Sequence, residues 1–567
     1  MFRKLFFAFA LTVLLLLSAY ACAETFVFYV SADGSYGTDA VGLTYTSGKY
    51  YLFLPGQARL DSLRIGYSGN AGQAVVLNGN TIDVGESAAC LKDENELRIG
   101  YKRIRFSVMQ GSKDLPVLYI TTQSGKLDRI HGNKKYKEPA YLVMTDGSGS
   151  EIYRGSLSYM KMRGNATTKY MKKNYQIKLE NGKNLLGMGK AKKWILTGSW
   201  IDKSFLRNEI SMDLARYMGI PYTPEHSQAE LYVNHEYLGL YLFSEKVEIN
   251  KNRIEVNELE KQTENLNTQD LSTYKKVYRT LSEGIKIKAF DIPSVPEEQS
   301  GGYLIEYEKL EGRYGAEASG FTTARGFMLV IKSPEYASVE QASYIARFMQ
   351  GFENAIFSPD GIDPVSGKHY YEFVDKDSLV RKYLLNEFIK NYDGNSSSEF
   401  FFKPEDSMST VAFAGPAWDL DNCFANYARD DNKKKLLTPE GFYIGGASQD
   451  ENWWPNLYAI PDFYDAVLRY YDGTFRTAAE ILLGKQEDPS GVLHSLDEYG
   501  RAIEKSAEMN YARYPALPGI TRNVQTGENL PENIEYIRSF IENRLAFLDR
   551  EWIENDNEYN LLQFLVR

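Results

Sequence analysis

Strand-like patterns fill most of the first half of the chain, and helical patterns fill most of the second half. Short runs such as KYYLFL, ELRIGY and LYVNHEYLGLYLF are rich in β-branched and aromatic residues and are separated by Gly, Asn and Asp. Helical periodicity appears in residues 338–356, 377–391, 460–484, 491–514 and 531–556. Because strands followed by helices are typical of α+β proteins, we predict an α+β body with two lobes.

The first unit after the N-terminus carries strand patterns alone. Residues 24–112 contain six short β-type runs with turn residues between them, which predicts a small all-β sandwich. The segment GSKDLP interrupts this pattern, and we place the domain boundary near Lys113. The remainder, residues 113–556, is predicted to be the mixed α+β domain, and residues 557–567 are predicted to be a C-terminal tail.

The composition excludes several classes of protein. Hydrophobic residues make up 43% and aromatic residues 14% of the 567 positions, which excludes a disordered or collagen-like chain. The formal net charge of −10 gives no electrostatic footprint for nucleic acid, so we predict no nucleic-acid partner.

The N-terminus predicts export from the cytoplasm. Two basic residues precede the apolar run 5–17, and small residues then flank Cys22 in AYACAE. This order is typical of a secretory signal peptide, here residues 1–23, with the mature chain beginning near Glu24. There are two alternatives to cleavage before Glu24: a lipid anchor on Cys22, or a signal that stays uncleaved as a membrane anchor. All three would place the protein at the cell surface or outside the cell.

The cysteine content predicts no disulfide framework. If Cys22 is removed with the signal, only Cys90 and Cys423 remain, and they lie in different predicted units. We therefore expect both thiols to be unpaired.

Three local predictions concern the middle of the chain. Asp202 is a good N-cap for a helix over residues 202–218. Asn234 and His235 separate two apolar runs and predict a β-hairpin. Residues 250–300 are polar and predict an insertion or a mobile loop.

Three aspartates are candidate catalytic and metal-binding residues. Asp393 follows an amphipathic helix directly, and Asp419 and Asp421 follow a short strand in AGPAWDLD. Phosphoryl transfer requires one carboxylate that orients the attacking hydroxyl and others that hold magnesium. The alternative is that Asp393 ends a helix and that Asp419 and Asp421 are solvated turn residues.

A second candidate site precedes them in the sequence. The segment RGNATTKYMKKNYQIKLE combines a small-residue turn at Gly164 with hydroxyls, a basic cluster and the strand-borne Lys178. Backbone amides in such a turn can approach an anion, and a lysine on a strand can reach phosphates. Lys172 and Lys173 are the next candidates for this role, and a solvated hairpin is the alternative.

The order of these segments resembles the CotH family of atypical protein kinases, named for a spore-coat protein. The matching segments include MRGNATTKYMKKNYQIKLE, LYVNHEYLGLYLFSEKVEINKNRI, GGYLIEYE, LNEFIKNYDGNSSSEFFFK and GPAWDLDNCFAN, and the resemblance spans residues 115 to about 556. It implies a two-lobed protein-kinase-like fold that uses ATP with Mg²⁺ or Mn²⁺.

The resemblance also implies roles for individual residues. The nucleotide-contacting residues would be Arg163, Gly164, Asn165, Lys178 and Glu245. Asp393 would be the catalytic residue, and Asp419 and Asp421 would bind the metal.

One departure from the kinase pattern concerns the second metal ligand. Ordinary kinases have an asparagine five residues after the catalytic aspartate, and this chain has Ser398 there. Asn395 is a candidate substitute.

Three functions remain open from the sequence. The first is a secreted or cell-surface bacterial kinase that transfers the γ-phosphoryl group of ATP to Ser or Thr of a protein partner. The second is a catalytically weak, kinase-like protein for surface adhesion or assembly. The third is a glycoside hydrolase with paired carboxylates in an aromatic cleft that Trp200, Trp418, Trp453 and Trp454 could line. The ordered segments that match the CotH family argue against this third function.

Overall fold

The computed structural model describes residues 25–30, 40–68, 74–83, 88, 90–427, 435–450, 452–515 and 527–554. Helix accounts for 30% and strand for 29% of the chain, which confirms the α+β class. The predicted signal peptide, Cys22, the predicted mature N-terminus and the C-terminal tail lie outside the described residues. Among the residues that are described, no helix is both long and apolar enough to cross a membrane.

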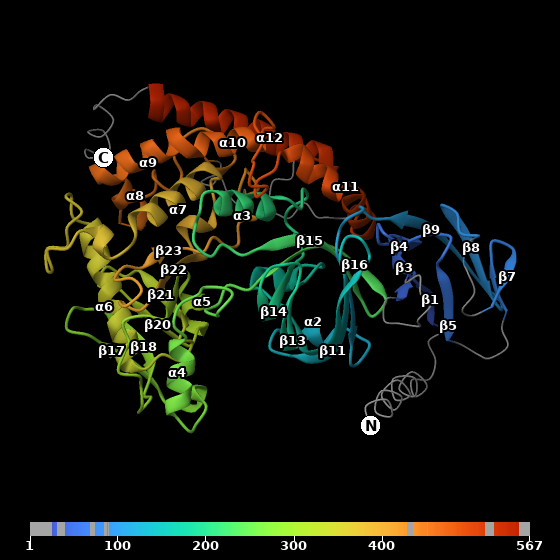
Figure 1. The fold of residues 1–567 in the computed structure, drawn as a ribbon, viewed down its shortest axis with the longest axis horizontal. Coiled ribbons are helices and arrows are strands. Elements are labelled where there is room, and N and C mark those ends of the chain that lie inside the picture. Colours follow the sequence, from blue (N-terminus) through green and yellow to red (C-terminus); the bar gives the residue numbers. More distant parts are fainter. Residues whose placement is uncertain are drawn as a thin grey trace.

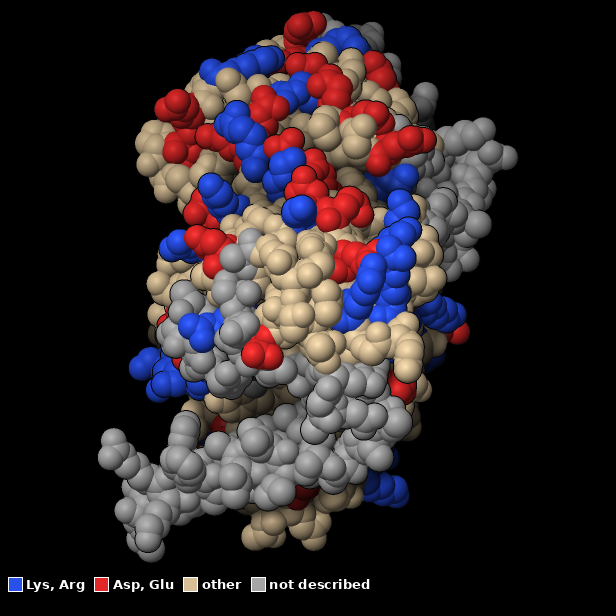
Figure 2. All heavy atoms as spheres, turned by 90° about the vertical axis from the view of Figure 1, so that its right-hand side faces the viewer, with Lys and Arg blue, Asp and Glu red and all other residues tan. Residues whose placement is uncertain are grey.

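Every described element N-terminal to residue 111 is a strand. A three-stranded sheet has the order β2-β1-β5, and a six-stranded sheet has the order β3-β4-β9-β8-β6-β7. The strands are β1 (Thr25–Tyr29), β2 (Ala40–Gly42), β3 (Thr44–Thr46), β4 (Lys49–Leu54), β5 (Arg64–Ser68), β6 (Val75–Leu77), β7 (Asn80–Ile82), β8 (Glu94–Ile99) and β9 (Lys102–Gln110). Figure 2 views the molecule from this end, and acidic and basic side chains lie side by side over much of the upper part of that face.

A closed β-barrel follows, with the strand order β10-β11-β12-β13-β14-β16-β15. Its strands are β10 (Val117–Thr122), β11 (Glu138–Thr145), β12 (Glu151–Arg163), β13 (Asn174–Asn184), β14 (Lys190–Thr197), β15 (His226–Val233) and β16 (Glu236–Glu245). Strands β15 and β16 form the predicted hairpin, and Asn234 and His235 have φ of 52° and 71°. Positive φ at both turn residues is what a tight two-residue hairpin requires.

The predicted boundary near Lys113 falls between β9 and β10, but the hydrophobic core is continuous across it. The core of the N-terminal sheets includes Val117 and Tyr232 of the barrel and Met509 of a C-terminal helix. The N-terminal strands therefore stabilise the barrel directly by apolar packing.

The second large sheet is antiparallel and has the order β17-β18-β20-β21-β19-β22-β23. Its strands are β17 (Lys276–Thr280), β18 (Lys286–Phe290), β19 (Tyr303–Tyr307), β20 (Ser319–Thr322), β21 (Met328–Ser333), β22 (Glu399–Lys403) and β23 (Phe413–Ala414). Residues 250–300 do not form the mobile loop that was one of the two predictions for them, because they contain β17, β18 and helix α4 (Leu259–Leu266). The buried Ile287 and Ala289 anchor β18 in the core despite the polar composition around them.

Helices cover the second sheet and extend to the barrel (Figure 1). They are α3 (Arg207–Tyr217), α5 (Glu311–Ala316), α6 (Val339–Ile356), α7 (Lys376–Phe388), α8 (Trp453–Tyr458), α9 (Pro461–Tyr470), α10 (Arg476–Leu482), α11 (Leu496–Arg513) and α12 (Leu530–Asp549). The short helix α2 (Asp128–Gly132) packs against β12 of the barrel. Helix α6 packs against β18 and β20, and α11 packs against β16 of the barrel and β9 of the N-terminal sheets.

Helix α3 begins five residues later than predicted. The N-cap position is Leu206 and not Asp202. The Asp202 carboxylate still accepts hydrogen bonds from the Ser204 amide and from the amide of Arg207, the first residue of the helix, and it pairs with the Arg207 side chain at 2.6 Å. These bonds hold a buried turn ahead of the helix.

Cys90 and Cys423 are both free, as predicted. Cys423 is buried in the core.

Candidate functional site

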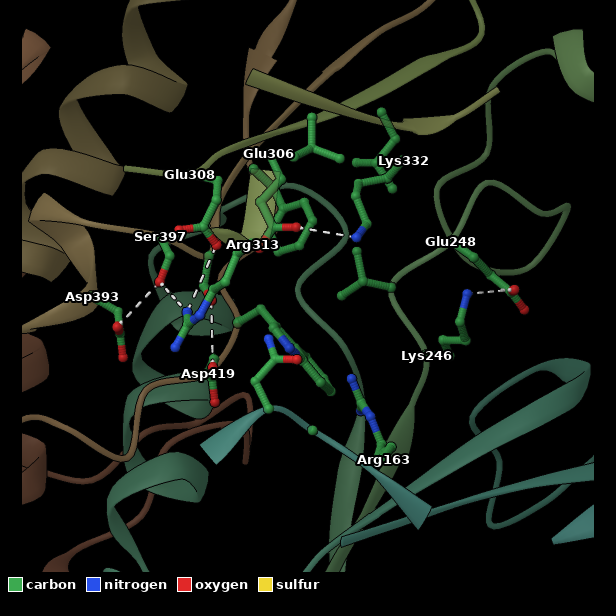
Figure 3. Close-up of a pocket in the computed structure, with 18 of the residues that line it drawn as sticks. Arg163, Lys246, Glu248, Glu306, Glu308, Arg313, Lys332, Asp393, Ser397 and Asp419 are labelled. Atoms are coloured by element: carbon green, nitrogen blue, oxygen red, sulfur yellow. Dashed lines mark hydrogen bonds and ion pairs between the residues drawn. The ribbon is translucent and has the colours of Figure 1, made fainter. Parts of the chain in front are cut away.

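A cavity of about 1950 Å³ lies between the barrel and the second sheet. Its walls come from the barrel strands β12, β13, β14 and β16 on one side, and from β19, β21, α5 and the loops that carry the three aspartates on the other. Figure 3 shows Arg163 and Lys246 on one side of this cavity and Asp393 and Asp419 on the other.

The barrel wall of the cavity is strongly basic. Between positions 134 and 246 the described lining residues include nine cations and no Asp or Glu: Lys134, Lys161, Arg163, Lys169, Lys178, Lys190, Lys192, Lys193 and Lys246. This excess of positive charge along one wall, in a protein whose net charge is −10, attracts anions into the cavity.

Among the described residues, Lys193 and Lys246 pair with Glu248, and the other seven of these cations, which include Arg163 and Lys161, have no carboxylate within ion-pair distance. The Arg163 guanidinium lies over the Trp418 ring at 5.3 Å. Burial, together with repulsion from Arg163, Lys246 and other nearby cations, lowers the pKa of Lys161. Half-buried cations that repel one another are stabilised by a bound anion.

The turn after Arg163 also fits an anion site. Gly164 has a φ of +100°, and a Cβ atom there would lie 1.8 Å from the Thr167 hydroxyl oxygen. Only glycine allows this conformation and this close approach. Asn165 accepts a hydrogen bond of 2.7 Å from Lys134, which holds that lysine beside the turn.

The structure brings the three predicted aspartates together. The Asn422 side-chain nitrogen donates to Asp393 Oδ2 at 3.2 Å and to Asp421 Oδ1 at 3.1 Å, so these two carboxylate oxygens are separated by no more than the sum of those distances. Asp419 belongs to the same loop, and Ser398 donates to its Oδ2 at 3.4 Å.

Burial and repulsion within the cluster raise the pKa of Asp393 and of Asp421. Burial and repulsion from Asp419 raise the pKa of Asp393 to about 7. Burial, followed by repulsion from Asp419 and Asp393, raises the pKa of Asp421 well above its ordinary value. The Asp419 side chain is exposed to the cavity. Desolvation by the surrounding protein raises its pKa, and the positive charge of Arg163 opposes this rise. Like charges held this close favour a cation.

This cluster predicts a specific dependence of stability on pH. Between the unfolded pKa of Asp393, near 3.8, and its folded pKa of about 7, the folded protein retains a proton that the unfolded chain has lost. The free energy of unfolding therefore falls as pH rises through this range. The amide side chain of Asp393→Asn has no such proton to lose. The free energy of unfolding of this variant, measured relative to that of wild type, should therefore rise by on the order of 1 kcal/mol or more between pH 5 and pH 8.

Chemical denaturation at the two pH values, without divalent ions, measures this gain. Asp377→Asn on the exposed face of α7 is the matched control, since its side chain is 77% exposed. A stability difference between Asp393→Asn and wild type that stays constant with pH would contradict the repulsive cluster.

The chain positions these acids through short, conformationally unusual segments. Ser398 and Asp419 adopt φ of 60° and 62°, and Lys390 before the Asp393 turn adopts 47°. Non-glycine residues in this region cost free energy and are characteristic of functional sites. The Lys390 ammonium donates to the carbonyls of Lys435, Thr438 and Glu440, which offsets the cost at that residue.

Four of the five predicted nucleotide residues line the cavity: Arg163, Gly164, Asn165 and Lys178. The assignment of Glu245 does not fit the structure. Its side chain pairs with Arg253 and accepts the Glu225 amide, and it is not part of the cavity wall. Side chains alternate along a strand, so the neighbours Ser244 and Lys246 face the cavity instead.

The two alternatives to Lys178, Lys172 and Lys173, lie away from the cavity. The buried Lys172 donates to the Leu240 carbonyl and to Asn510 Oδ1, and Lys173 donates to the Thr168 carbonyl at 2.8 Å. Neither lines the cavity. Lys172 instead connects the barrel to helix α11.

Sequence reasoning missed several residues of the site. Glu248 accepts from Lys246 at 3.0 Å and from Lys193 at 2.8 Å. Arg313 on α5 approaches Ser397 at 3.4 Å and opposes the rise in the pKa of Asp393. The FSEKVE segment gave a signal for Lys246 and Glu248, because strand alternation separates them from Glu245. No comparable signal existed for Arg313.

The aromatic cleft of a glycoside hydrolase is absent from the described cavity. Trp200, Trp453 and Trp454 are at most 6% exposed and belong to the hydrophobic core. Trp418 alone among the four lines the cavity. The positions of these tryptophans therefore do not support the glycoside hydrolase alternative.

The aspartate cluster suits a divalent cation by its chemistry. Carboxylate and amide oxygens from the three aspartates and Asn422 are the donors that Mg²⁺ prefers, and the repulsion among the acids is what a cation relieves. As the side chains lie, the described residues contain no group of three or more His, Cys, Asp or Glu close enough to hold a metal ion.

Asn395, the predicted substitute for the kinase asparagine, lines the cavity but accepts a hydrogen bond of 2.7 Å from Asn452. Asn422 is the amide that contacts both Asp393 and Asp421.

A comparison of the sequence with models of known protein families gives a match that includes most residues of the site. The family model described as CotH kinase protein matches residues 160–548, which is more than half of the chain. The match begins at β12 and includes both the Arg163 turn and the three aspartates. No curated protein matches the sequence. The chain belongs to the CotH kinase family.

Proposed function

We propose that this protein is an atypical kinase that transfers the γ-phosphoryl group of ATP to Ser or Thr hydroxyls of a protein partner. The observation that carries the proposal is the pairing of two oppositely charged walls across one cavity. Unpaired cations at Arg163 and Lys161 face the mutually repelling acids Asp393, Asp419 and Asp421. A triphosphate with a divalent cation complements both walls at once.

In this proposal the barrel and the second sheet with its helices are the two lobes of a kinase-like fold. Arg163, Lys178 and the Gly164 turn bind the phosphates, and Asp419 and Asp421 hold Mg²⁺ or Mn²⁺. The bound cation would neutralise charge that develops on the phosphoryl group. Asp393 orients the acceptor hydroxyl and accepts its proton, for which its raised pKa of about 7 is well suited.

We also propose that the protein works outside the cytoplasm, at the cell surface or secreted. The sequence of residues 1–23, which has the pattern of a secretory signal peptide, supports this location. The partner is then an exported protein with exposed Ser or Thr residues.

A catalytically weak, kinase-like binding protein is the second candidate. Ser398 at the position of the usual second metal ligand favours it. Such a protein would bind nucleotide without transferring phosphate.

Incubation with γ-labelled ATP and Mg²⁺ or Mn²⁺ separates the two candidates. The kinase proposal predicts label on Ser or Thr of an acceptor protein, or of the chain itself, that acid hydrolysis recovers as phosphoserine or phosphothreonine. Nucleotide binding without any labelled product would favour the binding protein.

A further inference from the structure

A row of buried polar side chains lies beneath the turn that carries Asp393. Its members are Lys382 and Asn386 of α7, Asn391 in the connection after α7, and Glu399 at the start of β22. Each is at most 3% exposed, and none lines the cavity described above. They therefore cannot contact a ligand there.

Hydrogen bonds link these side chains in series to the catalytic turn. Asn386 donates through its Nδ2 to Glu399 Oε1 at 3.0 Å. Asn391 donates through its Nδ2 to Asn386 Oδ1 at 2.9 Å. The backbone N–H of Asp393 donates to Asn391 Oδ1 at 3.2 Å.

The two ends of the series fix its direction. At one end, Glu399 Oε1 accepts from the amide nitrogen of Asn386, so the amide oxygen of Asn386 faces Asn391. A backbone N–H can only donate, so the oxygen of Asn391 must face Asp393. One orientation of each amide satisfies the whole series.

The Lys382 ammonium supports the ionised form of Glu399. It lies 3.5 Å from Glu399 Oε2 and donates to the Pro416 carbonyl at 3.0 Å. A buried ion pair contributes little to net stability compared with apolar residues of the same volume. Its presence under this turn fits a role in setting geometry.

The turn packs closely on this series because Gly394 lacks a side chain. A Cβ atom at Gly394 would lie 3.1 Å from Asn386 Cγ, which is closer than ordinary contact. The turn is also closed by the Ser396 and Ser397 amides, which donate to the Asp393 carbonyl at 2.8 and 2.9 Å. The series therefore reaches the turn through direct contact and not through a flexible link.

We propose that Asn386 and Asn391 are positioning residues that hold Asp393 in its reactive place, with the Lys382–Glu399 pair fixing their orientation. The inference rests on the proposed kinase function for its catalytic consequence. Its structural part, control of the Asp393 turn, stands on the bonds alone.

Asn386→Ala tests the proposal, and Asn533→Ala on α12 is the matched control. Asn533 is equally buried, at 1% exposure, and its side chain donates to one backbone carbonyl, that of Asn529 at 2.7 Å. Asn391→Ala is a second variant that removes only the last link, in case Asn386→Ala does not fold. Hydrogen exchange over residues 392–398 is measured together with kcat and with KM for ATP.

The expected result is exchange at least about tenfold faster over residues 392–398, with kcat lowered by about 10- to 100-fold and KM for ATP within about threefold of wild type. The control should change none of these. Wild-type exchange in both folded variants, or faster exchange with an unchanged kcat, would overturn the proposal. Faster exchange in a protein whose wild type transfers no phosphate would support the positioning role and contradict the kinase function.

Discussion

Asp393→Asn should lower the rate of phosphoryl transfer by about two or more orders of magnitude. The substitution keeps the volume of the side chain and its contact with Asn422, but an amide cannot accept a proton from the acceptor hydroxyl. Transfer assays at saturating ATP measure the change in kcat.

The design of this experiment separates catalysis from folding. Because Asp393→Asn relieves repulsion with Asp419, the variant should be at least as stable as wild type in the absence of a cation. Asp377→Asn, which is exposed on α7, should retain full activity. A stable Asp393→Asn variant with wild-type kcat would remove Asp393 from the reaction.

Arg163→Ala should weaken binding of ATP by at least about tenfold. Hydrogen bonds to a charged group contribute about 1.5–3 kcal/mol, and the Arg163 guanidinium has no competing carboxylate partner among the described residues. Isothermal titration calorimetry with Mg²⁺ present measures the change in Kd.

The controls for Arg163 test charge and geometry separately. Arg163→Lys keeps the charge but loses the planar fork, so it should restore only part of the affinity. Arg59→Ala removes an arginine whose side chain is 73% exposed and that is not part of the cavity wall, and it should leave Kd unchanged. Wild-type affinity in a folded Arg163→Ala variant would show that the phosphates bind elsewhere.

Local sequence signals predicted much of the fold. The Asn234–His235 hairpin and the long C-terminal helices are confirmed because turn chemistry and apolar periodicity act within a few residues. The strands within residues 250–300 were missed because β18 is short and gains its stability from neighbouring strands, which a local pattern does not show.

The sequence predicted those parts of the candidate site that depend on where a residue stands in its own strand, helix or loop. The clustering of Asp393, Asp419 and Asp421 was expected from their positions at the ends of neighbouring elements. Glu245 was assigned to the cavity in error because one residue along a strand reverses the direction of a side chain.

Other parts of the site depend on contacts that no sequence spacing encodes. Arg313 reaches the aspartates from the connection between β19 and β20, which the fold places over the Asp393 turn. The hydrogen bonds from Asn391 to Asn386 and from Asn386 to Glu399 depend on the packing of β22 against α7, which the sequence does not show.

Calorimetric titration of the purified protein with ATP, with and without Mg²⁺ or Mn²⁺, tests most directly whether the two charged walls bind a metal–nucleotide complex. We expect one binding site per chain, with an affinity that falls by about tenfold or more when the divalent cation is removed or when Asp419 is replaced by asparagine. Equal affinity with and without the cation, or no binding of ATP under either condition, would contradict the account.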